Sequence, residues 1–466
     1  MVDVTSERPA PGADFGPSLW AEALSHHREE TQPAADLPTQ ADVVIVGGGF
    51  SGLWTAYYLS LADPHRSITL LEAEHVGFGA SGRNGGWCMG WAEGIDALLE
   101  RPKTRTEGLR WARAMQSTLG EIKSVLDHES IDCDFHQGGT LTTATNRAQL
   151  ARLQRHHDQL LTWGFDESDF QWLAQKEALD RARVEGALGA QLTPHCAVIH
   201  PAKLVAGLAR VLRARGVRIY ERVRVTSIRG LMLSTNRGNV ACETLIRATE
   251  AYTRELPGYA RLVVPVVSAM VATAPLSDTL WTSIGLADRP TFCDARRVTV
   301  YGQRTQDGRI AFGARARHVR GTSLPAQYAS TNPIFEEVER ALYSLFPQLS
   351  NHAITHRWAG VLAISPRRHL EVAFDRDTQQ GHLGGYMGEG VAASNFAARR
   401  LVERMMNLPS DWVDAPFYVS RPKKWIPDPM RSAGIAIARH AAERADAAEQ
   451  KGATSPFWSK VFNALV

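Results

Sequence analysis

The pattern of apolar and glycine residues between positions 42 and 72 predicts a strand, a turn, a helix and a second strand. Residues 42–46 form a continuous β-branched run that ends in Gly47-Gly48-Gly49. A helical stretch follows from Gly52 to Leu61, and a second apolar run over 68–71 closes with Glu72. Continuous apolar runs of this length are typical of strands buried on both faces of a parallel sheet. We therefore expect a βαβ unit here.

The remaining segments alternate between the two periodicities. Helices are expected over 91–130, 147–182, 200–216, 391–405 and 429–450, and strands over 217–220, 223–228, 243–248 and much of 263–314. Alternating strands and helices followed by a strand-rich region predict a mixed α/β fold. The segment 1–40 lacks periodicity and is expected to be an extended arm, which Trp20 attaches to the body.

Composition excludes several classes of protein. The chain has 466 residues, of which 44% are hydrophobic and 22% charged, and 52 Lys and Arg against 49 Asp and Glu give a net charge of +3. These values exclude a disordered chain and a coiled coil. A dedicated nucleic-acid binder would carry a basic stripe; the sequence shows none, so no nucleic-acid partner is expected. The five cysteines are odd in number and contain no CxxC pair, so neither a disulfide framework nor a metal site is expected.

The sequence shows no membrane or export signal. No run reaches the roughly 18 apolar residues that a membrane span needs, and the most apolar stretch, 262–276, contains Pro265 and Pro275. The first 20 residues carry acidic residues and prolines in place of a basic start and an apolar core. We expect a cytoplasmic protein with reduced thiols.

Gly47-Gly48-Gly49-Phe50-Ser51-Gly52 matches the dinucleotide-binding pattern G-x-G-x-x-G. The match follows a predicted strand, opens a predicted helix, and precedes Glu72 by twenty residues, the position of the acid that binds ribose hydroxyls. Gly47 permits the tight turn, Gly49 lets pyrophosphate approach the backbone, and Gly52 allows close packing of helix on strand. A glycine-rich turn without a ligand is the less favoured alternative.

A second glycine-rich run, residues 77–86 (GFGASGRNGG), follows Glu72 closely. Such density of glycine and small polar residues indicates backbone that approaches a ligand. Residues 43–86 together resemble the D-amino-acid-oxidase-like family of FAD-dependent oxidoreductases, and within it the branch of gamma-glutamylputrescine oxidases and related amine oxidases. The chain is similar to this family at 131–141, 200–225, 248–253, 356–360 and 384–391 as well, so the resemblance covers about 40–405. Glu250 stands where the family's A-T-N-A-Y-T turn has Asn.

The resemblance implies a Rossmann-like FAD-binding domain with an inserted antiparallel β-sheet substrate domain. It assigns 41–90, 195–260 and 355–405 to the FAD-binding domain, 91–194 and 261–354 to the substrate domain with a helical block, and 406–466 to a C-terminal helical tail. The residues expected to bind FAD are Gly47, Gly49, Phe50, Ser51, Gly52, Glu72, Ala73, Gly79, Ala80, Ser81, Gly82, Arg83, Asn84, Gly85, Gly86, Val225 (through its backbone, at the adenine), Gly388, Glu389, Gly390 and Val391. The covalent relatives' His is absent, so FAD is expected to be bound non-covalently, with Cys88 as the alternative attachment point.

The family's chemistry is hydride transfer from the carbon next to a neutral amine to flavin N5, which gives an imine, followed by reoxidation by O₂ to yield H₂O₂. The helix that begins after Gly388-Glu389-Gly390 would place its positive end at the flavin. Many relatives have His where this chain has Glu389. A carboxylate there would oppose flavin reduction unless it is protonated or points away, and a solvent-facing Glu389 is the alternative.

Several positions bear on the substrate. Family members that oxidise α-amino acids carry a Gly-Leu-Arg-Pro stretch whose Arg holds the carboxylate, whereas this chain has Gly-Val-Leu-Ala at 360–363. A small-molecule amine, with any acidic group remote from the nitrogen, is therefore favoured. Tyr301 is the candidate catalytic residue. Side chains at Trp87, Met89 and Trp91 are expected either to line the pocket or to pack in the core, while Arg367, Arg368, His136 and His200 are expected to be structural.

Three alternatives remain open. The enzyme could pass its electrons to a carrier other than O₂, the chain could bind flavin without turnover, or it could be a monooxygenase, which would need a second nucleotide site that the sequence does not show. The oligomeric state and the identity of the amine are not encoded in any motif.

Overall fold

A computed structural model of the chain describes residues 18–21, 36–318, 332–453 and 455–465. The first sheet has the order β17-β18-β11-β1-β2-β8. Strands β18 to β8 of this order are parallel, whereas β17 at the edge and the β9-β10 hairpin attached to β11 pair antiparallel. Its strands are β1 (Gln40–Val46), β2 (Ile68–Leu71), β8 (Arg218–Tyr220), β9 (Val225–Arg229), β10 (Met232–Thr235), β11 (Gly238–Arg247), β17 (Glu371–Asp375) and β18 (Gln380–Gly384). The predicted βαβ unit is present.

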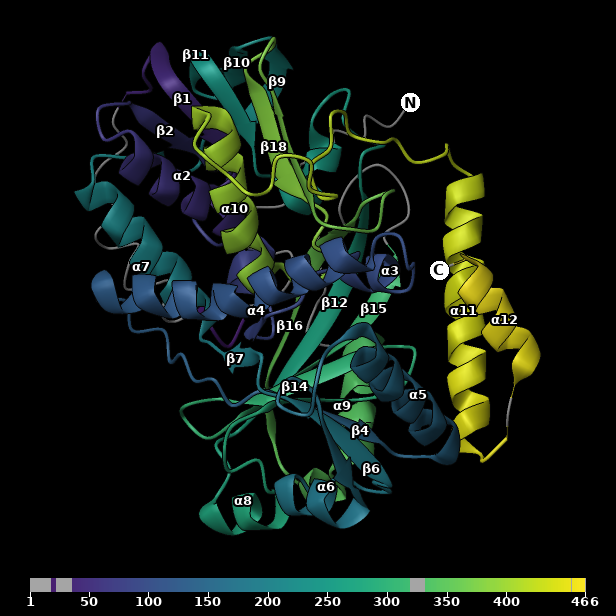
Figure 1. Cartoon of the computed structure of the whole chain (residues 1–466). Helices are drawn as coiled ribbons and strands as arrows, with labels where there is room; N and C mark the ends of the chain where they lie inside the picture. The colour runs from purple at the N-terminus through teal and green to yellow at the C-terminus, as the bar shows by residue number, and fades with distance from the viewer. Residues whose placement is uncertain (1–17, 22–35, 319–331, 454, 466) are drawn as a thin grey trace, which may run out of the picture.

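Helices cover this sheet because their apolar faces need a partner. α2 (Phe50–Ala62) packs between α7 (Pro201–Ala214) and α10 (Gly390–Met406), and α4 (Arg105–His128) packs across α10 (Figure 1). α2 is buried along most of its length, which explains its continuous apolar sequence. The short helix α3 (Ile95–Leu99) packs against α4, as does β3 (Trp87–Met89), which pairs with β7 (Cys196–Val198). In Figure 1, α3 lies at one end of α4 and β7 lies below it.

The second sheet has the order β16-β12-β15-β14-β13-β4-β6-β5 and is antiparallel except for the pair β13–β4. Its strands are β4 (Thr140–Ala144), β5 (Gln171–Ala174), β6 (Gly189–Thr193), β12 (Val264–Thr273), β13 (Thr291–Asp294), β14 (Val300–Arg304), β15 (Ile310–His318) and β16 (Ile354–Ile364). The helices α5 (Arg147–Trp163), α6 (Gln175–Arg181), α8 (Asp278–Ile284) and α9 (Pro333–Leu345) lie around it. The fold is thus the predicted mixed α/β arrangement of a Rossmann-like part and an antiparallel sheet.

Some elements differ from the sequence expectation. The helix expected over 147–182 ends at Trp163, because Gly164 adopts φ +107° and closes it, and a strand and the short helix α6 follow. Helix α8 lies inside the strand-rich region, where the Ser277 hydroxyl caps its first turn. Strand β16, which the sequence placed with the FAD-binding segments, pairs with β12 in the second sheet.

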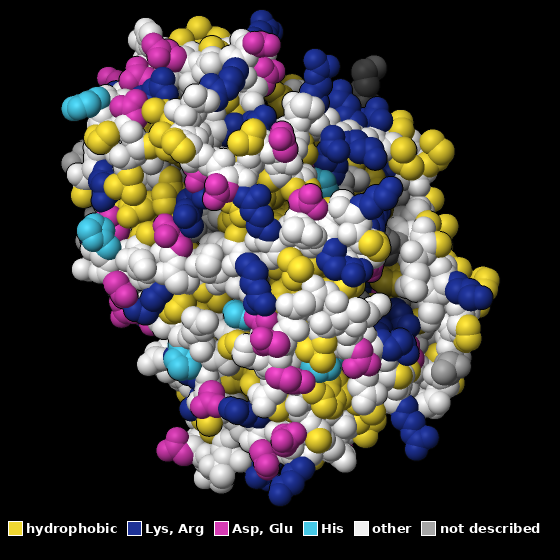
Figure 2. All heavy atoms as spheres, viewed as in Figure 1, with side chains coloured by type: hydrophobic (Ala, Val, Ile, Leu, Met, Phe, Trp, Pro, Cys, Tyr) yellow, Lys and Arg dark blue, Asp and Glu magenta, His cyan; other side chains and the backbone are white. Residues whose placement is uncertain are grey.

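Two peripheral segments contact the body. Most of the expected N-terminal arm lies outside the described residues, but Trp20 is 2% exposed and its indole N–H donates to the Asn84 carbonyl at 2.9 Å. At the other end of the chain, α11 (Met430–Gln450) and α12 (Pro456–Leu465) pack on each other and stand along one flank of the molecule (Figure 1). Lys and Arg side chains are concentrated on the upper part of that flank in Figure 2. None of the described helices is both long and apolar enough to cross a membrane.

Candidate active site

A large cavity of about 1550 Å³ lies between the two sheets and is lined by residues of both. Its walls come from the carboxyl ends of β1 and β2, the glycine-rich loop 77–86, strands β9, β12, β14 and β16, and the first turn of α10. Ligands of open α/β sheets bind beyond the carboxyl ends of the strands, and this cavity begins there and continues to the second sheet. A volume above the roughly 300–1,000 Å³ of ordinary ligand pockets suits a dinucleotide together with a small substrate.

The first turn of α2 is shaped for a phosphate group. A Cβ on Gly47 would lie 2.4 Å from the Ala248 carbonyl oxygen, and one on Gly52 would lie 2.0 Å from that of Gly47. Only glycine fits either position, as the fingerprint requires. This turn carries no acidic residue, and the side chain that meets its first N–H is the neutral Ser81 hydroxyl, which accepts from Phe50 N–H at 2.8 Å. The positive end of the helix is therefore not neutralised by a carboxylate of that turn and can attract an anion from the cavity.

Glu72 lies at the end of β2 with its carboxylate fixed by the backbone. Its oxygens accept hydrogen bonds from the N–H groups of Gly48 at 2.7 Å and Glu74 at 2.9 Å. Burial raises the pKa of Glu72 to about 7, while the two N–H groups oppose the rise. Next to it, Val225 lines the cavity together with Val223. The binding of ribose by Glu72 and of adenine beside Val225 stays a prediction.

The loop 77–86 is held by contacts at both ends. The Asn84 amide donates to the Ala80 and Ser81 carbonyls at 3.1 and 3.0 Å, and its oxygen accepts from Gly86 N–H at 2.8 Å. The Trp358 indole donates to the Arg83 carbonyl at 2.8 Å, and Arg83 Nε donates to the Phe78 carbonyl at 2.9 Å. These bonds give the loop one fixed shape beside the cavity.

The opposite end of the cavity is lined by side chains of the second sheet. Tyr301 lies against the loop 77–86, since a Cβ on Gly85 would lie 2.6 Å from its ring. Its hydroxyl is 2.6 Å from Ser268 Oγ, which donates to the Ala314 carbonyl at 3.2 Å. Trp87 packs edge-on against Tyr301 with ring centroids 6.1 Å apart. The predicted pocket residue thus lies at the wall of the cavity.

Two acids line the cavity between these ends. The charge of Glu389 acts on Cys293 and Cys196, whose pKa values rise to about 12 through burial first and this charge as a smaller cause. Glu250 accepts a hydrogen bond from Ala363 N–H at 3.0 Å, while its second oxygen is buried without a hydrogen-bond partner in the described structure. Burial raises the pKa of Glu250 to about 7.

Most of the predicted cofactor residues line this cavity. The exceptions are Gly52, Gly82 and Gly86. Gly52 allows α2 to pack closely on the strand before it. The Gly82 carbonyl accepts a hydrogen bond from Ser18 Oγ at 3.2 Å. Gly86 has a φ of +72° and lies against the Gln303 side chain. The cofactor role of the lining residues stays a prediction.

The expectations for individual side chains outside the cofactor set have different outcomes. Met89 and Trp91 do not line the cavity, and Trp91 packs on Phe165 and Phe170, so only Trp87 of these three borders it. The four residues expected to be structural have such contacts and lie away from the cavity. The His200 ring accepts from Lys203 N–H at 3.2 Å, His136 contacts the Asp288 carbonyl, Arg367 donates to the Arg421 carbonyl and Arg368 to that of Leu465.

Sequence reasoning missed several lining residues at the end of the cavity near Tyr301, among them Ser268, Cys293 and Thr299. Ser268 could have been noticed, because it is the single polar side chain inside the run VPVVSAMVA, all of which is buried in β12. A polar residue inside such a strand needs a partner. Cys293 and Thr299 carry no signal of their own, since their place depends on how β13 and β14 pair.

The cavity therefore fits FAD: it contains a glycine cradle at a helix N-terminus, an acid at the end of β2, and residues of the loop 77–86. In the sequence comparison, the family model described as "FAD dependent oxidoreductase" (DAO) matches residues 42–404. Gamma-glutamylputrescine oxidoreductase of Escherichia coli (strain K12) is 31% identical over 382 residues, covering 78% of this chain and 83% of that protein. The sarcosine oxidase subunit beta of Rhizobium meliloti (strain 1021) is 26% identical over 70% of this chain and 74% of its own.

Solved structures share the fold. Glycine oxidase from Geobacillus kaustophilus superposes with a TM-score of 0.68 at 20% identity, covering 82% of this chain and 99% of its own. The iminodiacetate oxidase from Chelativorans sp. BNC1 superposes with a TM-score of 0.65 at 18% identity, covering 82% of this chain and 100% of its own. The chain belongs to the DAO family of FAD-dependent oxidoreductases.

Proposed function

We propose that this protein oxidises the C–N bond of a primary or secondary amine to an imine, with O₂ as the electron acceptor. The observation that carries the proposal is the continuity of the cavity, which joins the glycine cradle to the wall formed by Tyr301 and Ser268. Hydride transfer from an amine to a flavin, the chemistry of the family, needs the cofactor and the substrate to lie in one connected cavity of this kind. Relatives named gamma-glutamylputrescine oxidoreductase and sarcosine oxidase support an amine as the substrate.

The residues of the chain would bind and orient both molecules. Glu72 would hold the ribose of FAD and the α2 N-terminus its pyrophosphate, while the loop 77–86 would border the flavin ring. When bound, FAD would take up the hydride from the carbon next to the amine nitrogen, and O₂ would leave as H₂O₂. No side chain at the cavity wall is needed as a strong base, because the substrate reacts as the neutral amine.

Tyr301 would orient the amine. Because Ser268 Oγ gives its proton to Ala314, the Tyr301 hydroxyl donates to Ser268 and its oxygen meets the substrate as an acceptor. The stretch 360–363 also lines this end at Gly360, Val361 and Leu362 without an arginine. The absence of an arginine from this stretch favours amines over α-amino acids, with any acidic group of the substrate remote from the nitrogen.

The purified protein tests the proposal directly. Flavin bands that acid precipitation releases would establish non-covalent FAD. Bleaching under anaerobic conditions by gamma-glutamylputrescine would support an amine whose acidic group is remote from the nitrogen, whereas faster bleaching by sarcosine or glycine, which are α-amino acids, would contradict the argument from the stretch 360–363. Recovery of the bands in air with formation of H₂O₂ supports the oxidase. Bleaching without recovery in air would favour an acceptor other than O₂, and absence of bleaching by every amine would refute the proposal.

A further inference from the structure

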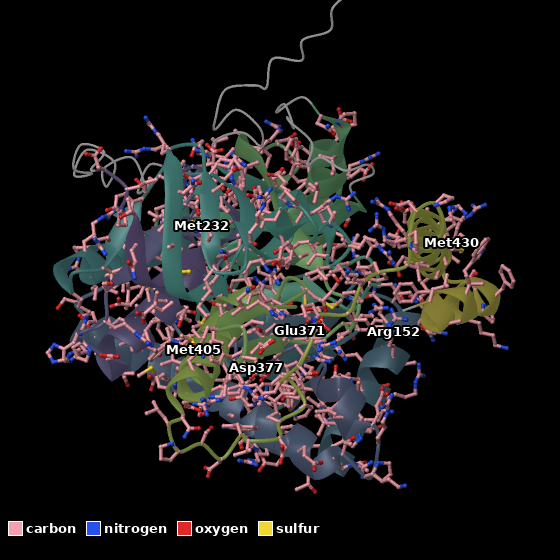
Figure 3. The ribbon with its side chains drawn as sticks, turned by 90° about the horizontal axis from the view of Figure 1, so that it is seen from above. Arg152, Met232, Glu371, Asp377, Met405 and Met430 are labelled. Atoms are coloured by element: carbon pink, nitrogen blue, oxygen red, sulfur yellow. The ribbon has the colours of Figure 1, made fainter. Side chains whose placement is uncertain are left out.

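The C-terminal hairpin, which we define as helices α11 and α12, lies outside the family match, which ends at residue 404. It is nevertheless joined to the second sheet by a buried network of charges. Figure 3 shows Arg152 of α5 on the side of the body that faces this hairpin. Arg152 binds both oxygens of Glu449 on α11 at 3.1 Å each.

The same network holds the loop between β13 and β14, residues 295–299. Asp446 of α11 accepts backbone hydrogen bonds from Arg297 N–H at 3.0 Å and Val298 N–H at 2.9 Å, one on each carboxylate oxygen. The Arg297 guanidinium donates to Glu449 at 2.5 Å. Arg152 donates to the Ala295 carbonyl at 2.6 Å. Three parts of this loop are therefore fixed by α5 and α11.

These contacts are not ordinary surface ion pairs. Asp446 is 8% exposed and Glu449 is 6% exposed, and two arginines balance the two acids. Surface ion pairs contribute little, whereas a buried carboxylate that accepts backbone N–H groups defines one geometry of the chain around it. The network adds to the bonds that hold the start of the loop from within the sheet, namely Ala295 N–H to the Thr143 carbonyl and Arg296 to Asp294, and it fixes the part of the loop at Arg297 and Val298.

The position of the loop decides the shape of the cavity. Cys293 precedes it on β13, Thr299 ends it, and Tyr301 follows on β14, and all three residues line the cavity. Phe292 pairs with Gly302, so Cys293 and Tyr301 face each other across the two strands. A shift of the loop would move the wall to which Tyr301 belongs.

We infer that the C-terminal hairpin is a brace of the substrate pocket and that Asp446 and Glu449 are positioning residues for its Cys293–Tyr301 wall. The inference rests on the proposed function only in naming this end of the cavity as the place of the amine. It gives the region beyond residue 404 a role in substrate specificity.

Asp446→Asn and Glu449→Gln in the FAD-loaded full chain test the inference. The amide that replaces the Asp446 carboxylate offers one acceptor to two backbone N–H groups and turns its own N–H₂ toward the second, so the loop loses a charge-assisted hydrogen bond. The matched control is Glu443→Gln, which removes an exposed carboxylate of the same helix that pairs with Arg439. All variants are first compared for FAD content.

The first readout does not need turnover: the labelling rate of Cys293 by N-ethylmaleimide, followed by mass spectrometry. Cys293 is the half-buried one of the five cysteines, the other four being buried. Release of the loop should raise its labelling rate by about tenfold, the value of one hydrogen bond to a charged group. The control should label at the parent rate. Equal rates in all four proteins would overturn the brace.

The second readout separates positioning from stability. With the amine that bleaches the parent enzyme fastest, Asp446→Asn should raise KM by about tenfold with kcat within about twofold, because the wall binds the amine but does not react. Full FAD content with KM unchanged would overturn the inference, as would loss of FAD in both variants. If no amine bleaches the parent, the proposed function fails, and Cys293 labelling still decides the brace.

Discussion

Glu250, a half-buried acid at the wall of the cavity, is expected to make the stability of the protein depend on pH. Its side chain has one hydrogen bond, from Ala363 N–H at 3.0 Å, and its second oxygen has no hydrogen-bond partner in the described structure. Burial raises its pKa from 4.5 to about 7, against the smaller opposing effect of the Ala363 and Ala251 N–H groups. The folded protein therefore keeps this proton over a range of pH in which the unfolded chain has lost it.

The sign of the effect follows from proton binding. Where the folded state binds more protons, the free energy of unfolding falls as pH rises. Below pH 4.5 Glu250 is protonated in both states, so it does not lower the free energy of unfolding. Between pH 4.5 and about pH 7 the free energy of unfolding falls progressively, because only the unfolded chain releases this proton. The difference between a pKa of 4.5 and one of about 7 amounts to about 3 kcal/mol, at about 1.4 kcal/mol for each tenfold change in proton affinity.

Glu250→Gln removes the proton and with it this dependence. For 466 residues, an unfolding entropy of about 2.1 cal/mol/K per residue gives about 1 kcal/mol/K, so the variant should gain about 3 °C in Tm over the parent on going from pH 5 to pH 8.5. Thermal melts of the FAD-loaded proteins at one scan rate measure this difference. Glu72, whose pKa is also raised to about 7, is common to both proteins and cancels.

The control for this experiment is Glu443→Gln, in which an exposed carboxylate is removed. It should change Tm by the same small amount at both pH values. A Glu250→Gln variant whose Tm difference from the parent is equal at pH 5 and pH 8.5 would refute the argument, since the carboxyl would then be ionised in the folded protein as readily as in the unfolded chain.

The remaining predictions concern two residues of the cavity wall, the packing of helix on strand at Gly52, and helix α11. Tyr301→Phe removes the hydrogen bond to Ser268 and should lower kcat/KM about fivefold to tenfold, with FAD content unchanged, in steady-state assays with the bleaching amine. Glu72→Gln should weaken FAD binding at least about tenfold in a fluorescence titration, because it removes a charged acceptor; unchanged affinity would contradict the ribose-binding role. Gly52→Ala places a Cβ 2.0 Å from a backbone oxygen and should abolish stable FAD binding, whereas Gly434→Ala, with nothing within 4 Å, should stabilise α11 by about 0.5–1 kcal/mol in melts.

The nucleotide end of the site was predictable because its signals are local. The strand 42–46, the fingerprint and Glu72 lie within about thirty residues of one another, and each residue type is required by the backbone there. The glycine density of residues 77–86 indicated a second stretch of backbone near a ligand, and the resemblance to a known family added Tyr301; residues of this loop and Tyr301 line the cavity. The prediction of a helix over 147–182 is wrong at 164–174, because Gly164 with a φ of +107° ends α5 and a strand follows before α6 begins at Gln175.

The substrate end could not be predicted in the same way, because its residues meet only through the pairing of distant strands. Ser268 and Tyr301 are 33 positions apart, and their contact depends on the register of β12 and β14 against β15. A shift of one residue in either strand would turn these side chains to the other face of the sheet. No feature of the two residues by themselves fixes that register.

The brace is the extreme case of this dependence. Asp446 accepts a hydrogen bond from the backbone N–H of Arg297, which lies 149 positions away in the sequence. Because almost every residue type carries the same backbone N–H group, the residue types at 297 and 298 do not reveal this contact. In the sequence, Asp446 is one of several charged residues in an alanine-rich helix, and its pattern gives only an exposed helix with salt bridges. What distinguishes it from Glu443, three residues earlier, is the face of α11 that the loop 295–299 happens to meet. A tail without a motif can therefore carry a constraint on the substrate pocket, and the two carboxylates of the same helix offer the comparison that tests it.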